Sequence, residues 1–313
     1  MYKQIDYSLL MDLRVDFAFK IFIESNPGSL VSLLNSIFAN KKIPRIVKSA
    51  TLKNTYLDKK STDDKLSILD VRAELDDGTN VLIELHMYGL GELKSKTIRS
   101  WARAHGEELE VGQTYSAQPP TITIAFTNGS VEPIENNKNA NTNKDKIHRL
   151  CMIMDVEDFT VFTNAMELHY IDMKAFANAV NEADSININD TNEAMFAKWL
   201  SVITEKEIKN KAIIENACSE EEEIQMAVTA LQRQSEDKLV RQAYLRRQDE
   251  IYFYNKELAD NTRRMEQAER KAEQFALKAE QFATKAEQFA LREDGLQAEI
   301  KELRQKLAEL EAK

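Results

Sequence analysis

The chain has 313 residues, of which 43% are hydrophobic and 8% aromatic, enough for one sizeable core or two modest ones with residues left for a tail. Its formal net charge of −10 at pH 7 argues against a protein that coats nucleic acid indiscriminately, because phosphate neutralisation drives such binding. No apolar run approaches the roughly 20 residues of a membrane helix, and the N-terminus lacks a signal-type pattern, so a soluble cytoplasmic protein with no membrane partner is expected.

Zinc and disulfide chemistry are both disfavoured by the residue spacing. Cys151 and Cys218 are the only cysteines and lack the close pairing of zinc ligands, so we expect two reduced thiols that fill the core. The four histidines form no HxxxH pattern. Residues 41–60 carry seven lysines and arginines against one aspartate, which predicts a local basic surface despite the acidic total.

Hydrophobic periodicity predicts two helices, followed by strands and helices that alternate along the chain. The predicted helices cover 15–25, 29–40 and 94–111, the strands cover 66–77, 79–88, 119–128, 146–156 and 162–173, and everything from Met173 onward is helical in character. Asp77-Gly78 between the first two strands is a strong hairpin signal, and the Asn-rich stretch 136–146 reads as a loop. These elements predict an α/β fold.

The tail contains an identical repeat: KAEQFAL, KAEQFAT and KAEQFAL occupy residues 271–291 without a gap. Seven residues is the period of a coiled coil, with alanines at position a, phenylalanines at position d, and a register that runs from Leu258 to Leu310. We therefore expect a coiled coil through which the chain forms a homo-oligomer. A lone charged helix is the alternative, because Glu293 occupies an a position and alanines bury little area.

The hairpin carries the strongest candidate site. Asp70 lies within ILDV and Glu84 within VLIEL, and burying carboxylates among such apolar neighbours is costly unless they are paired or bound to a metal. Residues on neighbouring strands of a hairpin come close enough to share one divalent cation. The alternative is that both carboxylates point to solvent from a half-exposed sheet.

Further motifs accompany this pair in a fixed order. An opening D-x-x-F-K-x-x-F pattern is matched by Asp16, Phe19, Lys20 and, one position early, Phe22, and a leucine-leucine-asparagine element is matched by Leu33, Leu34 and Asn35. The two strands of the hairpin match ILDV, with Asp70, and I-E-x-Q, with Ile83, Glu84, Leu85 and His86. An arginine-bearing helix that ends near G-x-x-Y is matched by Arg99, Arg103, Gly112 and Tyr115. Trp199 and the AYLRRQDE run also fit. Over roughly residues 12–260, this ordered set resembles the recombination-promoting nuclease or putative transposase family of the PD-(D/E)XK nucleases.

The resemblance implies a restriction-endonuclease-like fold, a mixed central sheet flanked by helices, followed here by a helical region and the long C-terminal coiled coil. It implies that Asp70 and Glu84 ligate Mg²⁺ or Mn²⁺, that Asp16 supports the metal through water, and that the residue at position 86 orients the attacking water. Arg99, Arg103 and Lys20 are implied to contact DNA phosphates. Lys20 paired structurally with Asp16, and arginines that simply face solvent, remain the alternatives.

Position 86 departs from the family pattern, because histidine stands where glutamine is usual. A histidine can donate or accept a hydrogen bond and can act as a base near neutral pH, so we assign His86 a catalytic role. The alternatives are that it binds a softer metal, marks an enzyme that has lost activity, or is a structural histidine without a role in the site.

The sequence thus predicts three domains: a PD-(D/E)XK-like nuclease domain over 1–175, a helical region over 176–250 and a coiled-coil tail over 251–313. The predicted function is that of a Mg²⁺-dependent DNA endonuclease, transposase-like and recombination-promoting, which hydrolyses phosphodiester bonds. The alternative is a catalytically inactive relative that acts as a DNA-binding or oligomeric scaffold.

Overall fold

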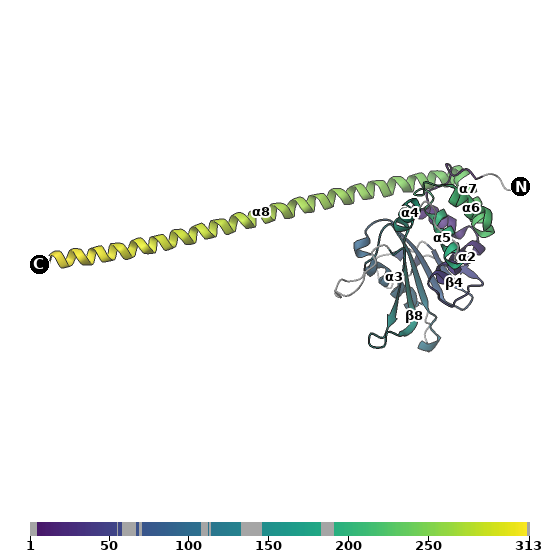
Figure 1. Cartoon of the computed structure of the whole chain (residues 1–313), viewed down its shortest axis with the longest axis horizontal. Helices are drawn as coiled ribbons and strands as arrows, with labels where there is room; N and C mark the ends of the chain where they lie inside the picture. Colours follow the sequence, from purple (N-terminus) through teal and green to yellow (C-terminus); the bar gives the residue numbers. More distant parts are fainter. Residues whose placement is uncertain are drawn as a thin grey trace. The chain divides into compact units, whose positions relative to one another are not determined.

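The computed structural model describes residues 5–54, 56–57, 67–68, 71–107, 112, 114–132, 146–182 and 191–311 (Figure 1). The chain divides into two compact units, residues 1–248 and residues 249–313. The predicted Asn-rich loop lies outside the described residues except for Lys146. Among the described helices, none is both long and apolar enough to cross a membrane.

The first unit combines helices with strands, and the described part of the second unit is helical. They are α1 (Asp16–Glu24), α2 (Pro27–Asn40), α3 (Leu93–Glu107), α4 (Met173–Glu182), α5 (Thr191–Ile203), α6 (Ala212–Glu220), α7 (Glu222–Glu236) and α8 (Lys238–Glu311), with short 3-10 turns at Leu90–Glu92 and Tyr115–Ala117. The strands are β1 (Ala50–Leu52), β2 (Tyr56–Leu57), β3 (Ser67–Ile68), β4 (Val71–Leu75), β5 (Asn80–His86), β6 (Thr121–Thr127), β7 (His148–Met154) and β8 (Val161–Asp172).

Local sequence signals set the first elements. Asn26 caps α2 by accepting a hydrogen bond from the Gly28 amide at 2.8 Å, and Pro27 occupies the first turn, where its missing N–H costs nothing. The predicted hairpin between β4 and β5 is confirmed. Gly78 takes φ +83° at the turn, and the Leu75 amide donates to the Thr79 carbonyl at 2.9 Å.

Six strands form one mixed sheet in the order β1-β4-β5-β6-β8-β7. The β4–β5 and β7–β8 pairs are antiparallel, whereas β5, β6 and β8 run parallel to one another. The predicted mixed central sheet flanked by helices is therefore confirmed. The three-residue strand β1 lies in the basic stretch and was not predicted, because three residues carry too little alternation to signal a strand.

The two faces of this sheet are covered by different helices. On one face, Leu93 of α3 packs with Ala125 of β6 and Tyr170 of β8, and Ala104 of α3 packs on Leu82. On the other face, helices α1 and α2 supply the cover: the Phe19 ring lies 5.3 Å from that of Phe126, and the Phe38 ring lies 5.8 Å from that of His169. A side chain's position in the strand alternation therefore decides which helices it meets.

The helices after β8 pack back onto α1 and α2 rather than forming a separate core. Trp199 of α5, 1% exposed, donates from Nε1 to the Ser32 hydroxyl of α2 at 3.1 Å. The Ser29 hydroxyl donates to the Glu223 carbonyl of α7 at 2.8 Å. Residues up to Gln248 consequently form one compact unit.

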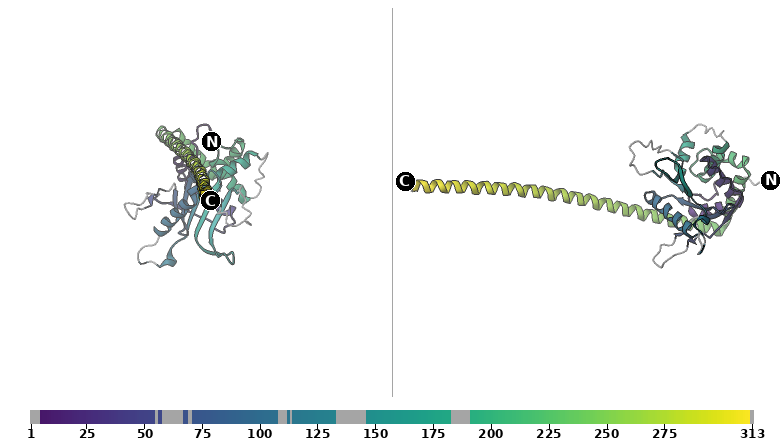
Figure 2. Two further views of the ribbon diagram at one scale, coloured as in Figure 1. Left: turned by 90° about the vertical axis from the view of Figure 1, so that its left-hand side faces the viewer. Right: turned by 90° about the horizontal axis from the view of Figure 1, so that it is seen from below.

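Helix α8 runs without interruption from Lys238 to Glu311 and supplies all of the described part of the second unit (Figure 2). The expected long C-terminal helix is thus confirmed, whereas self-association through it stays a prediction. Its large apolar residues from Leu258 to Leu307 are exposed, and the three repeat phenylalanines Phe275, Phe282 and Phe289 are 71%, 72% and 71% exposed.

Candidate active site

Glu84 is a buried carboxylate near the end of β5. It is 6% exposed, lies beside Ala125 of β6, and shares with Leu82 the sheet face that α3 covers. Tyr170 of β8 pairs with Ala125 and continues this row of side chains. The next row contains His86, Thr127 and Asp172. The site therefore lies at the carboxyl ends of three parallel strands, where α/β sheets commonly place their binding residues.

His86 is the direct partner of Glu84. Its Nε2 lies 2.8 Å from Glu84 Oε2, and because a carboxylate only accepts hydrogen bonds, Nε2 carries the proton in this contact. The His86 side chain is 20% exposed against 8% for that of Glu84, so the pair opens to solvent through the imidazole. Among the described residues, no lysine or arginine forms an ion pair with Glu84. The structure thus brings two of the three predicted catalytic residues together.

Two residues beside this pair were not predicted from the sequence. Tyr170 is 5% exposed, and burial, together with the nearby negative charge of Glu84, raises the pKa of its phenol despite a hydrogen bond with Thr97 of α3. Asp172 is buried at the end of β8, where burial raises the pKa of its carboxyl and its Oδ1 accepts the Ala175 amide at 2.9 Å. The alternation on β8 placed these residues on one face, but only the parallel pairing with β6 reveals that Glu84 shares it.

Asp70, the other predicted metal ligand, lies outside the described residues. The neighbouring pairing is described: Val71 lies opposite Ile83, the residue before Glu84, and Arg72 lies opposite Leu82. Arg72 Nη1 contacts Glu107 Oε2 of α3 at 3.3 Å. These contacts fix β4 against β5 and α3 up to the residue that follows Asp70 in the sequence.

Asp16 and Lys20 stand on α1, the helix that packs through Phe19 on the opposite sheet face. The Asp16 carboxylate accepts from Arg247 Nε at 2.8 Å and 3.0 Å, so its charge is paired with that guanidinium. Lys20 contacts Glu24 one turn later, at 3.8 Å. The structure does not bring Asp16 together with Glu84 and His86 into one group of metal ligands among the described residues.

The two arginines of α3 lie on the same side of the sheet as Glu84. The buried residues of α3 are Leu93, Thr97, Ser100 and Ala104. Arg99 is exposed to solvent, whereas Arg103 is half-buried.

Arg45 belongs to the basic stretch that was expected to form a surface. Its side chain instead pairs with Glu167 at 3.0 Å on the other face of the sheet.

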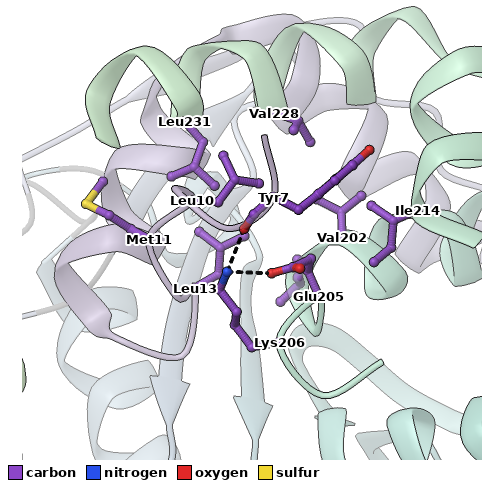
Figure 3. A pocket seen from close by; sticks show the side chains of 11 residues that line it. Tyr7, Leu10, Met11, Leu13, Val202, Glu205, Lys206, Ile214, Val228 and Leu231 are labelled. Atoms are coloured by element: carbon purple, nitrogen blue, oxygen red, sulfur yellow. Dashed lines mark hydrogen bonds and ion pairs between the residues drawn. The ribbon is translucent and has the colours of Figure 1, made fainter. Parts of the chain in front are cut away.

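A shallow pocket lies away from these residues, between the N-terminal segment and helices α5, α6 and α7 (Figure 3). Lys206 reaches across its mouth, donating to the Tyr7 carbonyl at 2.8 Å and contacting Glu205 at 3.1 Å. The remaining lining is mostly apolar, including Leu10, Val202 and Leu231. None of the predicted site residues lines it.

Both cysteines are free, and burial raises the pKa of the Cys218 thiol beside Tyr7 to about 11.

Comparison with known proteins gives one match. A family model described as PD-(D/E)XK nuclease family transposase matches residues 13–261. This range takes in the mixed sheet, Glu84 and His86, the helices packed on the sheet and the start of α8. Neither the curated proteins nor the solved structures gave a significant match.

Proposed function

We propose a function that starts from the family of this chain, which belongs to the PD-(D/E)XK nuclease family transposases. Membership supports a function of the nuclease or transposase kind. The proposal is narrower: the chain is a metal-dependent endonuclease that hydrolyses phosphodiester bonds of DNA and promotes recombination, with Mg²⁺ or Mn²⁺ as cofactor.

The burial of Glu84, with no lysine or arginine paired to it among the described residues, is the observation that carries this proposal. Its carboxylate is 6% exposed, and its described hydrogen-bonding partner is His86. An unpaired buried carboxylate lowers the free energy of unfolding by several kcal/mol unless a cation balances its charge. The His86 side chain is 20% exposed, so the Glu84–His86 pair reaches solvent on the imidazole side.

We assign Asp70 as the second metal ligand, and the described strand register supports this assignment. Val71 lies opposite Ile83, and these are the residues next to Asp70 and Glu84 in the sequence. Two carboxylates on neighbouring strands provide the oxygen ligands that Mg²⁺ prefers. Asp16 remains a proposed ligand through water, although its described pairing with Arg247 gives it a structural role as well.

The residues present fit such an ion, because one buried carboxylate is available at a solvent-facing strand end. A bound Mg²⁺ would neutralise charge on the phosphate and lower the pKa of a coordinated water. His86 holds the Glu84 carboxylate in place through Nε2 and is the group nearest to solvent, so we assign it the orientation of the attacking water. Tyr170 and Thr97 close the inner side of the site.

For DNA binding we favour the arginines of α3 over Lys20. Helix α3 covers the sheet face that holds Glu84, and Arg99 is exposed there with Arg103 one turn further along. A phosphate bound beside Glu84 would therefore lie on the same side of the sheet as both guanidinium groups. Lys20 stands on α1, which packs on the other face, so its proposed contact with DNA requires the strand to wrap around the sheet edge.

The test is cleavage of supercoiled plasmid DNA by the full chain, with and without Mg²⁺ or Mn²⁺, beside a single-stranded RNA substrate. Glu84→Gln and Asp70→Asn are each expected to lower the cleavage rate by roughly 100-fold or more, because each removes a ligand charge. Glu74→Gln is the matched control, since Glu74 lies on β4 but is half-exposed and paired with Lys53 at 2.7 Å. Cleavage that survives in both site variants would refute the site.

An inactive scaffold is the second candidate, favoured by histidine at position 86. Isothermal titration with Mg²⁺ separates the candidates, because a scaffold has no reason to bind the ion through Glu84. His86→Gln restores the residue usual in the family and keeps a donor beside Glu84. Cleavage gained only in this variant would identify the chain as a relative that lost activity at this position.

A further inference from the structure

Helix α8 presents an unpartnered apolar stripe over most of its length. Written as heptads, the a positions are Leu258, Met265, Ala272, Ala279, Ala286, Glu293, Ile300 and Leu307, and the d positions are Asn261, Ala268, Phe275, Phe282, Phe289, Leu296 and Leu303. Their large apolar members are 43% to 72% exposed, for example Leu258 at 43% and Phe282 at 72%. A long exposed stripe at the coiled-coil period requires a partner helix.

We propose that the partner is the same helix of a second copy of the chain, paired antiparallel about a two-fold axis between residues 280 and 281. This alignment deepens the self-association of the tail expected from its heptads and rests on it. In an antiparallel pair each a residue faces a d residue of the other chain, so residues whose numbers sum to 561 share a core layer.

The repeat favours this arrangement because large residues then face small ones. Phe282 meets Ala279 of the partner subunit, Phe275 meets Ala286 of the partner subunit, and Phe289 meets Ala272 of the partner subunit. Each layer of the repeat then holds one phenylalanine and one alanine, and the two helices keep a constant separation. A parallel pair in register would instead alternate layers of two phenylalanines with layers of two alanines. Such a core is overpacked in one layer and void in the next.

The same alignment matches the helix on both sides of the repeat. Leu258 faces Leu303 of the partner subunit, and Met265 faces Leu296 of the partner subunit. Glu293, which interrupts the a positions, faces Ala268 of the partner subunit and can extend its carboxylate past that small side chain to water. In a parallel pair Glu293 would face its own copy, placing two like charges in one core layer.

Charges flanking the core are mixed, and they are the weaker contribution. At the g positions Arg264 meets Glu299 of the partner subunit, whereas Lys278 meets Lys285 of the partner subunit. All of these side chains are exposed. The parallel alternative would gain pairs such as Arg264 with Glu269 of the partner subunit. Exposed ion pairs contribute little and are screened by salt, so core packing decides the orientation.

Lysine-specific cross-linking of the unmodified full chain, read by mass spectrometry, tests the alignment. Lys256 and Lys306 are both exposed and lie about 75 Å apart along one straight helix, so a single chain cannot join them with a short linker. In the antiparallel pair Lys256 lies next to Lys306 of the partner subunit. We expect the Lys256–Lys306 cross-link in a covalent dimer, formed between light and heavy chains when an isotope-mixed sample is used.

Sedimentation of the same sample separates the ways in which the proposal fails. A dimer joined through two copies of Lys306, or one lacking the Lys256–Lys306 link, overturns the antiparallel alignment but leaves self-association standing. A monomer overturns both. The variant with Phe275, Phe282 and Phe289 each replaced by alanine is the matched control, and it is expected to lose the cross-link while the first unit keeps its thermal unfolding transition. None of these outcomes bears on DNA cleavage, which is tested separately at Glu84.

Discussion

The tripeptide Glu-Leu-His occurs twice in this chain, and the two copies lie on opposite faces of the same sheet. Glu84 and His86 end β5 on the face covered by α3, whereas Glu167 and His169 lie in β8 on the face covered by α2. Both glutamates are buried, at 6% and 2% exposed. The same three residues therefore meet two different sets of neighbours.

The second copy is neutralised from within the protein. Arg45 donates to both carboxylate oxygens of Glu167 at 3.0 Å, and although burial by itself raises the pKa of Glu167, its contacts with His169 and Arg45 hold it below the ordinary value. Further hydrogen bonds extend from this pair. His169 Nδ1 lies 2.9 Å from His148 Nε2, and His148 Nδ1 lies 2.7 Å from Asn40 Oδ1. Glu84 receives no such guanidinium among the described residues. The contrast teaches that the missing cation, rather than the tripeptide, marks the candidate site.

The largest effect on stability is expected at Arg45. Arg45→Met leaves the Glu167 carboxylate buried without its cation, and breaking a buried pair in this way costs about 3–5 kcal/mol of unfolding free energy. Urea denaturation followed by circular dichroism measures it. Arg45→Lys keeps the charge but loses the two-point contact, so an intermediate loss is expected.

A double variant provides the control for that loss. Arg45→Met combined with Glu167→Leu removes both charges and should be more stable than Arg45→Met alone. If Arg45→Met were as stable as the original chain, the network would not be the internally neutralised counterpart of the Glu84 site.

Acid is expected to weaken the second face through its histidines. Burial lowers the pKa of His148 to about 2, with the neighbouring charges of His169, Lys41 and Lys146 adding to it, and burial also lowers the pKa of His169 against the opposing effect of Glu167. Both rings are therefore neutral when folded and take up protons on unfolding. The contribution of His148 is full above about pH 6.5 and falls below it by about 1.4 kcal/mol per pH unit, and the lowered pKa of His169 acts in the same direction.

Unfolding free energies between pH 7 and pH 5 test this titration, because Glu167 itself titrates below that range. For His148 alone the expected loss at pH 5 is about 2 kcal/mol. His148→Gln removes the ring and should flatten the profile by that amount. Equal slopes in the variant and the original chain would show that His148 does not control acid stability.

The smallest effect on stability is expected at Glu84. Glu84→Gln keeps the shape and an oxygen that can accept from His86, and it removes a buried charge that no described lysine or arginine balances. Removal of this charge offsets the weaker contact with His86, so the unfolding free energy should fall by less than about 1 kcal/mol, or rise, in the absence of metal. Glu167→Gln is the matched substitution in the other copy and should cost more. Equal losses at the two positions would erase the distinction between the faces.

Much of the local structure followed from short-range signals. Pro27-Gly28 separated two helices, Asp77-Gly78 produced the β4–β5 hairpin, and the heptads of residues 271–291 produced a continuous helix. Glu84 was recognised because a carboxylate interrupts an apolar strand, and His86 because it stands where the family motif usually has glutamine. Tyr170 was missed, since its pairing with Ala125 depends on a parallel contact between strands that are separated by β7 in the chain.

The sequence alone determined the types of most elements, the presence of the hairpin and the heptad positions, because neighbouring residues fix backbone geometry and the spacing of side chains along one helix or strand. It could not determine which buried charges are paired. Arg45 reaches Glu167 across 122 positions of the chain, and Arg247 reaches Asp16 across 231. Those contacts exist only once the strand order and the helix packing bring the groups together, and they decide which carboxylate is paired with a guanidinium and which has none among the described residues.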